Sequence, residues 1–280
     1  MKEIGYYNGK TGPLGEMTVP MNDRVCWFGD GVYDVALAPG RVPYLFDRHI
    51  DRFFTSAALI RIDMPLGRDE LKKLIFELIG MADDDDLLVY MQVTRGTAPR
   101  AHAFPEGAKA NLWLTVTPKK VAPKEGFASV ITTDDNRYYL CNIKTLNLIP
   151  NCMAEQFAKD AGCDTAIFHR GDRVTEAAHS NVQIITGGKV ITPPADNLIL
   201  PGISRGRMIE ICKDIGIPVE IRPFTLDEML SADEIFLTSS LSPCRRVGKV
   251  NLADRGMKDP DTFFRLQDAV YADFAGANKD

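Results

Sequence analysis

The stretch Leu87-Leu88-Val89-Tyr90-Met91-Gln92-Val93-Thr94 contains neither glycine nor proline and is dominated by apolar residues. The apolar residues at its odd-numbered positions alternate with residues of mixed polarity, which predicts a largely buried β-strand. A second strand is predicted at Leu112–Val116. Before both strands, apolar residues recur at helical spacing over Phe46–Ala57, with Asp47 as the expected cap, and over Leu71–Ile79. The first part of the chain therefore combines strands and helices.

Beyond residue 126 the same mixture continues. Helical spacing predicts three further helices, and short runs rich in β-branched residues predict five further strands. The helices are Ile149–Ala161, Ser204–Ile215 and Thr262–Phe274, and the strands are Ala128–Thr133, Thr165–His169, Val182–Thr186, Val219–Ile221 and Glu234–Leu237. The elements are interleaved without a regular strand–helix–strand rhythm, which favours the α+β class.

A polar segment punctuated by proline separates the two parts. It runs Pro118-Lys119-Lys120-Val121-Ala122-Pro123-Lys124-Glu125-Gly126 and has the composition of a linker. A chain of 280 residues is long enough for two domains, since domains hold about 150 residues each. We therefore expect a small α+β domain at 1–118, a linker at 119–126 and a larger domain at 127–280.

Composition and charge exclude several classes of protein. The formal net charge of −5 gives no basic face, so we expect no nucleic acid as partner. The chain lacks an apolar run of about 18 residues and its first residues lack the apolar core of a signal peptide, so we expect no membrane association. The six cysteines form no Cys-x-x-Cys pair and most sit among apolar neighbours, which favours reduced thiols and a cytoplasmic protein.

Several familiar motifs are missing from the chain. The run Gly29-Asp30-Gly31 lacks the third glycine of a dinucleotide fingerprint, and there is no phosphate loop with its lysine. The four histidines have no metal-ligand spacing, and Asp83–Asp86 has the features of a solvated loop, so no metal site is expected.

Lys144 lies in the run Leu140-Cys141-Asn142-Ile143-Lys144-Thr145-Leu146, where it is the single cation. Apolar surroundings disfavour the charged form of a lysine, and a neutral amine is the nucleophile needed to form a Schiff base. The alternative is a lysine at a strand end whose stem is buried and whose amine reaches water. Local sequence leaves both open.

Glu176 follows Val174-Thr175 and precedes two alanines, so a flat ring could approach it closely. Against a pyridine nitrogen, this carboxylate would keep the ring protonated and so able to withdraw electrons from a carbanion. The alternative is an exposed glutamate on a loop.

Phosphate could be bound at two places. The run Gly202-Ile203-Ser204-Arg205 opens a predicted helix, whose first N–H groups favour an anion, although Ser204 could be only a helix cap. The hydroxyls of Thr238-Ser239-Ser240 would lie at the end of a buried strand. Arg52, on the helix that begins near Asp47, could reach an anion or only water.

The densest polar cluster is Arg95-Gly96-Thr97-Ala98-Pro99-Arg100-Ala101-His102-Ala103-Phe104-Pro105, directly after the buried strand. Glycine and two prolines restrict its conformations. An arginine fork on such a loop could bind a carboxylate through two parallel hydrogen bonds, or the loop could be a basic surface segment.

These motifs occur in an order along nearly the whole chain that resembles the fold-type IV pyridoxal-phosphate enzymes. That family contains branched-chain aminotransferases, D-amino-acid aminotransferases and aminodeoxychorismate lyases, and the run Arg95–His102 is similar to the D-amino-acid aminotransferases in particular. The motifs that carry the resemblance are Phe28-Gly29-Asp30-Gly31-Val32-Tyr33-Asp34, His49-Ile50-Asp51-Arg52, Lys144-Thr145-Leu146-Asn147, Val174-Thr175-Glu176, Leu200-Pro201-Gly202-Ile203-Ser204-Arg205 and Thr238-Ser239-Ser240.

The resemblance implies pyridoxal 5'-phosphate bound between a small α+β domain and a larger barrel-like domain, in a homodimer. Lys144 would be the catalytic Schiff-base lysine, which also moves the substrate's proton, and Glu176 would pair with the pyridine nitrogen. The remaining implied roles are phosphate binding by Arg52, Ile203, Ser204 and Ser240, a hydroxyl near the ring from Ser239, and capture of the substrate carboxylate by Tyr33, Arg100 and His102, the last two from the other subunit.

Two segments depart from the family pattern. His179 stands in Ala177-Ala178-His179-Ser180, where related D-amino-acid aminotransferases have a small Gly/Ser-rich run, and two arginines follow Cys244. We expect transamination between a small D-amino acid, such as D-alanine, and a 2-keto acid, 2-ketoglutarate or pyruvate. The alternatives are an L-branched-chain aminotransferase or an aminodeoxychorismate lyase on the same fold, or a binding protein without activity, which the presence of both Lys144 and Glu176 disfavours.

Overall fold

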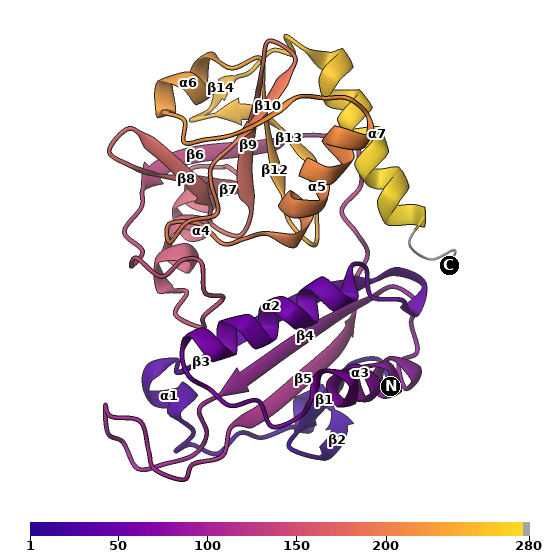
Figure 1. Cartoon of the computed structure of the whole chain (residues 1–280), viewed down its shortest axis with the longest axis vertical. Helices are drawn as coiled ribbons and strands as arrows, with labels where there is room; N and C mark the ends of the chain where they lie inside the picture. Colours follow the sequence, from indigo (N-terminus) through magenta and orange to yellow (C-terminus); the bar gives the residue numbers. More distant parts are fainter. Residues whose placement is uncertain (277–280) are drawn as a thin grey trace. The chain divides into compact units, whose positions relative to one another are not determined.

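The computed structural model describes residues 1–276, which form two compact units (Figure 1). The first unit contains Met1–Val121 and also Ile143–Asn147, and the second contains Ala122–Asn142 and the chain from Leu148 onward. The sequence predicted a boundary at 118/119 and assigned 143–147 to the second domain, whereas the contacts group those five residues with the first unit.

The first unit is built on a five-stranded antiparallel sheet with the strand order β2-β1-β5-β4-β3. Helix α2 runs along this sheet in Figure 1 and packs on β3, while α3 contacts β5. The bounds are β1 Ile4–Tyr7, β2 Lys10–Pro13, α1 Arg24–Phe28, β3 Gly31–Ala38, α2 Phe46–Leu59, α3 Arg68–Gly80, β4 Leu87–Thr94 and β5 Asn111–Pro118, with short 3-10 turns at Leu14–Glu16 and Pro39–Arg41.

The core of the first unit lies between one face of this sheet and the two helices. Ile50 and Phe53 of α2 and Ile75 of α3 are fully buried against apolar residues of β3, β4 and β5, such as Val89. The predicted strand 87–94 is confirmed, and both predicted helices are found with slightly wider bounds. The expected cap Asp47 is wrong. Leu45 occupies the cap position with φ of 50° and no capping side chain, and Asp47 lies inside the first turn.

The second unit contains a curled, barrel-like sheet in the order β11-β10-β9-β12-β13-β6-β7-β8, with β14 paired to β13 (Figure 1). Parallel and antiparallel pairs are mixed in this sheet. The bounds are β6 Ala128–Asp134, α4 Ile149–Asp160, β7 Thr165–Arg170, β8 Arg173–Ala177, β9 Asn181–Thr186, β10 Lys189–Thr192, α5 Ile203–Asp214, β11 Val219–Ile221, α6 Leu226–Ser231, β12 Glu234–Thr238, β13 Arg245–Val250, β14 Ala253–Asp254 and α7 Pro260–Gly276.

Helices α5 and α7 contact one another beside the sheet of the second unit. Met208 of α5 and Phe263 of α7 join Phe236 of β12 in one buried apolar cluster. This packing fixes the start of α5 relative to the ends of β9 and β12, which is the part of the fold that matters for the site. Across residues 1–276, every helix is too short or too polar to cross a membrane.

Candidate active site

Lys144 lies in a segment that extends the first sheet at the free edge of β3. The backbone N–H of Tyr33 donates to the carbonyl of Lys144 at 2.9 Å, and the N–H of Leu146 donates to the carbonyl of Gly31 at 3.2 Å. The backbone N–H of Lys144 donates to Oγ of Ser56 on α2 at 3.3 Å. These bonds place a half-buried lysine at a fixed register beside β3.

Glycine is required at position 31 for this arrangement. A Cβ there would lie 2.5 Å from the carbonyl oxygen of Val93 and 2.8 Å from Cδ1 of Leu146. Both distances are far below van der Waals contact, so a side chain at Gly31 would displace the segment that carries Lys144. The structure therefore explains why the second glycine of the Phe28–Asp34 motif, Gly31, is needed.

The amine of Lys144 lies over an aromatic ring. Its Nζ is 4.2 Å from the centroid of the Tyr33 ring, close enough for a cation–π contact when the amine is charged. Tyr33 in turn stacks on Tyr90 with the ring centroids 5.5 Å apart. The structure therefore brings together two of the residues that the sequence singled out, Tyr33 and Lys144.

Arg52 faces a buried carboxylate that the sequence reasoning had quoted but not assigned. Its Nε and Nη2 donate to the two oxygens of Asp34 at 2.7 and 2.8 Å, and Nδ1 of His49 lies 2.7 Å from Oδ1 of the same residue. Burial works to raise the pKa of Asp34, but the charge and hydrogen bond of Arg52 and the bond from His49 outweigh it and lower the pKa. The paired carboxylate fixes the direction of the Arg52 fork.

In the second unit, Glu176 lies near the end of β8 and is 6% exposed. Its Oε1 accepts a short hydrogen bond from Nη1 of Arg137, and its Oε2 accepts from the backbone N–H of Leu200 at 3.0 Å and from Nδ2 of Asn181 at 3.2 Å. These donors hold the carboxylate in one orientation.

Arg137, which binds Glu176, is a residue of this candidate site that sequence reasoning missed. Its Nε and Nη2 donate to the two oxygens of Asp135 at 2.9 and 2.8 Å. Burial works to lower the pKa of Arg137, but the hydrogen bond with Asp135 and the negative charges of Glu176 and Asp135 raise it overall. A signal was present, since the polar run Asp134-Asp135-Asn136-Arg137 directly follows the predicted strand Ala128–Thr133.

Asn181 joins Glu176 to the start of α5. Its Nδ2 also donates to the carbonyl of Leu200 at 2.9 Å, and a Cβ added to Gly202 would lie 1.9 Å from its Oδ1. Gly202 is the N-cap of α5, and no side chain caps the helix there. The alternative of Ser204 as cap is therefore wrong, and Ile203 and Ser204 are the first two residues of the helix.

Ser239 and Ser240 directly follow β12, whose last residue Thr238 pairs with Asn181 of β9. The structure thus places this run near the residues that bind Glu176. The side chain of Ser239 also stabilises the local backbone, because its Oγ accepts a hydrogen bond from the N–H of Ser242 at 3.1 Å. That bond holds the turn after β12.

Arg100 and His102 lie on the loop between β4 and β5 in the first unit, where both are exposed. They contact the same ring. The guanidinium carbon of Arg100 is 5.2 Å from the centroid of Phe28, and the ring of His102 is 5.3 Å from it, centroid to centroid. The structure therefore brings these two predicted carboxylate ligands together.

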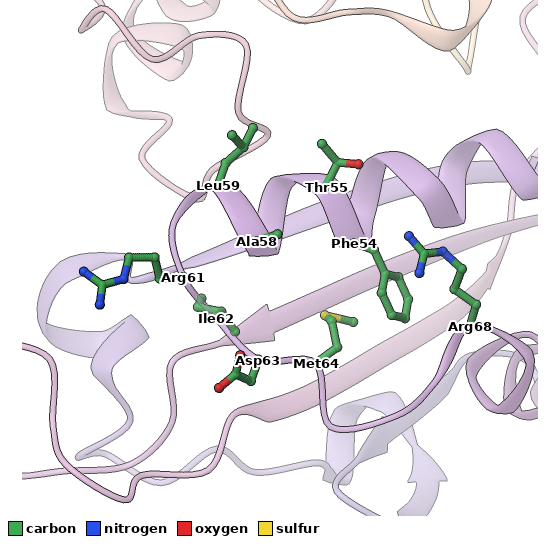
Figure 2. Close-up of a pocket in the computed structure, with 9 residues that line it drawn as sticks. All are labelled: Phe54, Thr55, Ala58, Leu59, Arg61, Ile62, Asp63, Met64 and Arg68. Atoms are coloured by element: carbon green, nitrogen blue, oxygen red, sulfur yellow. The ribbon is translucent and has the colours of Figure 1, made fainter.

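A cavity of about 790 Å³ lies elsewhere in the first unit, at the end of α2. Figure 2 shows Arg61 and Arg68 at opposite ends of it. None of the predicted site residues lines this cavity; its residues are Phe54, Thr55, Ala58, Leu59, Arg61, Ile62, Asp63, Met64 and Arg68.

Each unit, taken by itself, presents groups of a kind that suits one part of pyridoxal 5'-phosphate. The uncapped start of α5 presents N–H groups of the kind that bind phosphate. The carboxylate of Glu176, fixed by three donors, suits a protonated pyridine nitrogen. The half-buried amine of Lys144 suits an aldehyde.

Comparison with known proteins agrees with this fit. The family model described as amino-transferase class IV matches residues 31–250. The D-alanine aminotransferase of Listeria monocytogenes serotype 1/2a (strain 10403S) is 38% identical over 255 residues, covering 88% of each chain. That of Bacillus licheniformis is 38% identical over 236 residues, covering 84% of this chain and 83% of the relative.

Two solved structures share the fold at low identity. The branched-chain amino acid aminotransferase from Escherichia coli has a TM-score of 0.88 at 19% identity, covering 97% of this chain and 94% of that one. The branched-chain aminotransferase from the thermophilic archaeon Thermoproteus uzoniensis, solved with norvaline, has a TM-score of 0.87 at 22% identity, covering 98% and 94%.

The curled sheet, the small α+β unit and the family match together define the class of the protein. It is a transaminase that uses pyridoxal 5'-phosphate. The chain belongs to the class IV aminotransferases, and its resemblance to the fold-type IV enzymes is confirmed.

Proposed function

We propose that this enzyme transfers the amino group of a small D-amino acid, such as D-alanine, to a 2-keto acid, 2-ketoglutarate or pyruvate, in two half-reactions. The observation that carries the proposal is the contact of Arg100 and His102 with one ring, that of Phe28. It brings together two side chains that can bind a carboxylate, on the segment most similar to D-amino-acid aminotransferases. The relatives named D-alanine aminotransferase, 38% identical over most of their length, support it.

Each half-reaction needs groups that bind, orient and move a proton. We assign Nζ of Lys144 to covalent attachment of the cofactor and to removal of the proton from the substrate's alpha carbon. The cofactor, when bound, supplies the electron sink for that step. Glu176, fixed by Arg137 and Asn181, holds a proton on the ring nitrogen.

The remaining residues bind the two anionic groups. We assign the cofactor phosphate to Arg52, to Ile203 and Ser204 at the start of α5, and to Ser240, with Ser239 near the ring. We assign the substrate carboxylate to Tyr33, Arg100 and His102. The contact of Nζ of Lys144 with the Tyr33 ring supports placing a carboxylate ligand beside the amine.

We infer that the enzyme works as a homodimer in which Arg100 and His102 act on the partner's substrate. Helix α4 offers an apolar stripe for such an interface. Ile149, Met153 and Phe157 follow one another at intervals of four residues, on one face of the helix, and are 71%, 51% and 50% exposed. We also propose the cytoplasm as its location, because all six cysteines are free.

A coupled assay with 2-ketoglutarate as acceptor tests the reaction. D-alanine should be consumed, and L-alanine and L-leucine should react far more slowly. Turnover of L-leucine in preference to D-alanine would instead indicate the branched-chain reaction. Release of pyruvate from aminodeoxychorismate without a keto acid would indicate the lyase.

A further inference from the structure

Arg100 and His102 sit on an exposed loop, which on its own would leave two long polar side chains free to sample many rotamers. A pair that binds a carboxylate must instead be held near one geometry before the substrate arrives. The structure supplies such support from a short segment of the same unit, α1 and the residues after it.

Phe28, the last residue of α1, is the common contact of the pair. Arg100 lies over its ring at 5.2 Å from guanidinium carbon to centroid, and the His102 ring is tilted against it by 47° at 5.3 Å. A second arginine, Arg24, has its guanidinium carbon 4.9 Å from the same centroid. The ring thus orders both loop side chains through cation–π and ring contacts.

Arg24 binds the backbone of the loop. Its side chain is 3% exposed, and its Nη1 donates to the carbonyls of Ala101 at 2.6 Å and Ala103 at 3.3 Å. These two carbonyls flank His102. The guanidinium therefore fixes the backbone on both sides of one of the proposed carboxylate ligands.

Asp30 fixes Arg24 in turn. Its Oδ2 accepts from Nε of Arg24 at 2.7 Å and from Nε of Arg95 at 2.9 Å. Arg95 also lies over the ring of Phe104, on the far side of the loop, at 3.5 Å. One largely buried carboxylate thereby links the segment 24–30 to both ends of the loop.

The base of the loop is equally constrained. The N–H of Arg24 donates to the carbonyl of Gly96 at 3.0 Å. Gly96 has φ of 107°, and a Cβ there would lie 2.0 Å from the carbonyl oxygen of Lys109, so only glycine allows this turn. The loop is therefore anchored at its start, at its middle and at Phe104.

We propose that Phe28 and Arg24 are positioning residues for the substrate carboxylate: they hold Arg100 and His102 in the binding geometry without touching the substrate. The inference rests on the proposed function of the Arg100–His102 pair and extends it to the segment that supports the pair. Preorganisation predicts an effect on substrate affinity and little effect on the chemical step.

The test compares holoenzymes carrying Phe28→Leu, Phe28→Tyr, Arg24→Lys and Arg100→Ala, with Phe76→Leu as control. Phe76 is an exposed phenylalanine on α3 that packs edge-on against Phe46. Single-turnover mixing with D-alanine, followed by the cofactor's absorbance, separates the dissociation constant from the rate of the half-reaction. Calorimetric titration with propionate, which has a carboxylate but no amine, measures carboxylate binding without turnover.

Phe28→Leu should weaken D-alanine and propionate binding by about tenfold with a nearly unchanged rate constant. Phe28→Tyr, which keeps the ring face, should restore both affinities. Arg24→Lys should act like Phe28→Leu, because an ammonium lacks the separate nitrogens with which Arg24 binds Asp30 and the loop carbonyls. If that buried variant fails to fold, the two Phe28 variants still decide the matter.

Unchanged affinities in Phe28→Leu beside weakened binding in Arg100→Ala would overturn the positioning role and leave the proposed function standing. Unchanged affinities in both variants would overturn the carboxylate pair itself, and the positioning role with it. An equal loss in Phe76→Leu would show a general effect of removing a ring and would also overturn the inference.

Discussion

The carbonyl of Lys144 accepts a hydrogen bond from the backbone N–H of Tyr33 at 2.9 Å, which fixes the register of the lysine against β3. With that register set, Nζ is held at the Tyr33 ring. Lys144→Ala removes the amine and leaves this backbone bond in place. We expect the variant to lose activity by about 10²–10⁴-fold while its Tm stays near that of the parent.

Borohydride reduction gives the matching chemical measurement. Treatment of the holoenzyme should fix the cofactor to the peptide that contains Lys144, as read by mass spectrometry. Lys189→Ala, which removes an exposed lysine paired with Glu220, is the control and should retain both the labelled peptide and the activity. Turnover by Lys144→Ala at the parent rate would refute the assignment.

The charge of Glu176 is the subject of the second prediction. Glu176→Gln keeps the size of the side chain but cannot hold a proton on the ring nitrogen. We expect turnover to fall roughly 10²–10³-fold, which is typical for removing one preorganised electrostatic group. Arg137 keeps Asp135 as its partner, so folding should survive. The absorbance of the bound cofactor, followed from about neutral to mildly basic pH, should shift relative to the parent. An unchanged spectrum and rate would contradict the role.

Gly202→Ala tests the start of α5. The new Cβ would lie 1.9 Å from Oδ1 of Asn181, so Asn181 must move away from Glu176. Losing a buried hydrogen bond to a charged group costs about 1.5–3 kcal/mol, and we expect weaker binding of pyridoxal 5'-phosphate. Equilibrium titration of the apoenzyme measures it. Gly206→Ala, inside the same helix with open space around its Cβ, should bind the cofactor normally.

His49 gives the protein an acid-sensitive point in the first unit. Burial lowers the pKa of His49, although the hydrogen bond and charge of Asp34 work to raise it. Below about pH 6.5, the ordinary pKa of histidine, His49 binds a proton in the unfolded chain but not yet in the folded chain. The contribution of His49 to the free energy of unfolding is therefore complete above this pH. It declines as the pH falls from there toward the lowered pKa of the folded chain.

His49→Asn should reduce that decline, because the amide nitrogen can replace Nδ1 at Asp34 without titrating. Each proton difference is worth up to about 1.4 kcal/mol per pH unit. Scanning calorimetry between about pH 7 and about pH 4, which spans the ordinary pKa of histidine, would show a shallower fall of Tm in the variant. An identical pH dependence in the two proteins would contradict the prediction.

Charges on the apolar stripe of α4 should disrupt assembly. Met153→Lys with Phe157→Lys places two ammonium groups on exposed apolar positions. We expect light scattering to report a monomer with greatly reduced D-alanine turnover, because Arg100 and His102 would lack a partner site. Phe76→Lys, a similarly exposed position on α3, should remain dimeric. A fully active monomer would contradict the shared site.

The sequence predicted what is local. Strand 87–94 and the helices of the first unit follow from hydrophobic periodicity, and Lys144 and Glu176 stand out within their own motifs. Arg137 does not stand out in the sequence, because its proposed role depends on a contact with Glu176, which is 39 positions away. Pairings of this kind arise from the register of distant strands, which periodicity does not contain. The sequence also did not indicate that Leu45 precedes α2 in a left-handed conformation, since a leucine rarely adopts that conformation.

Residues 143–147 belong to one unit while the chain on either side of them belongs to the other. A fragment ending at Val121 therefore lacks the strand-edge segment that carries the amine, and a fragment starting at Ala122 retains that segment without its sheet. Neither unit can be expressed as an uninterrupted piece of this gene product, so cutting the protein between its units would separate Lys144, the proposed nucleophile, from the sheet that orients it.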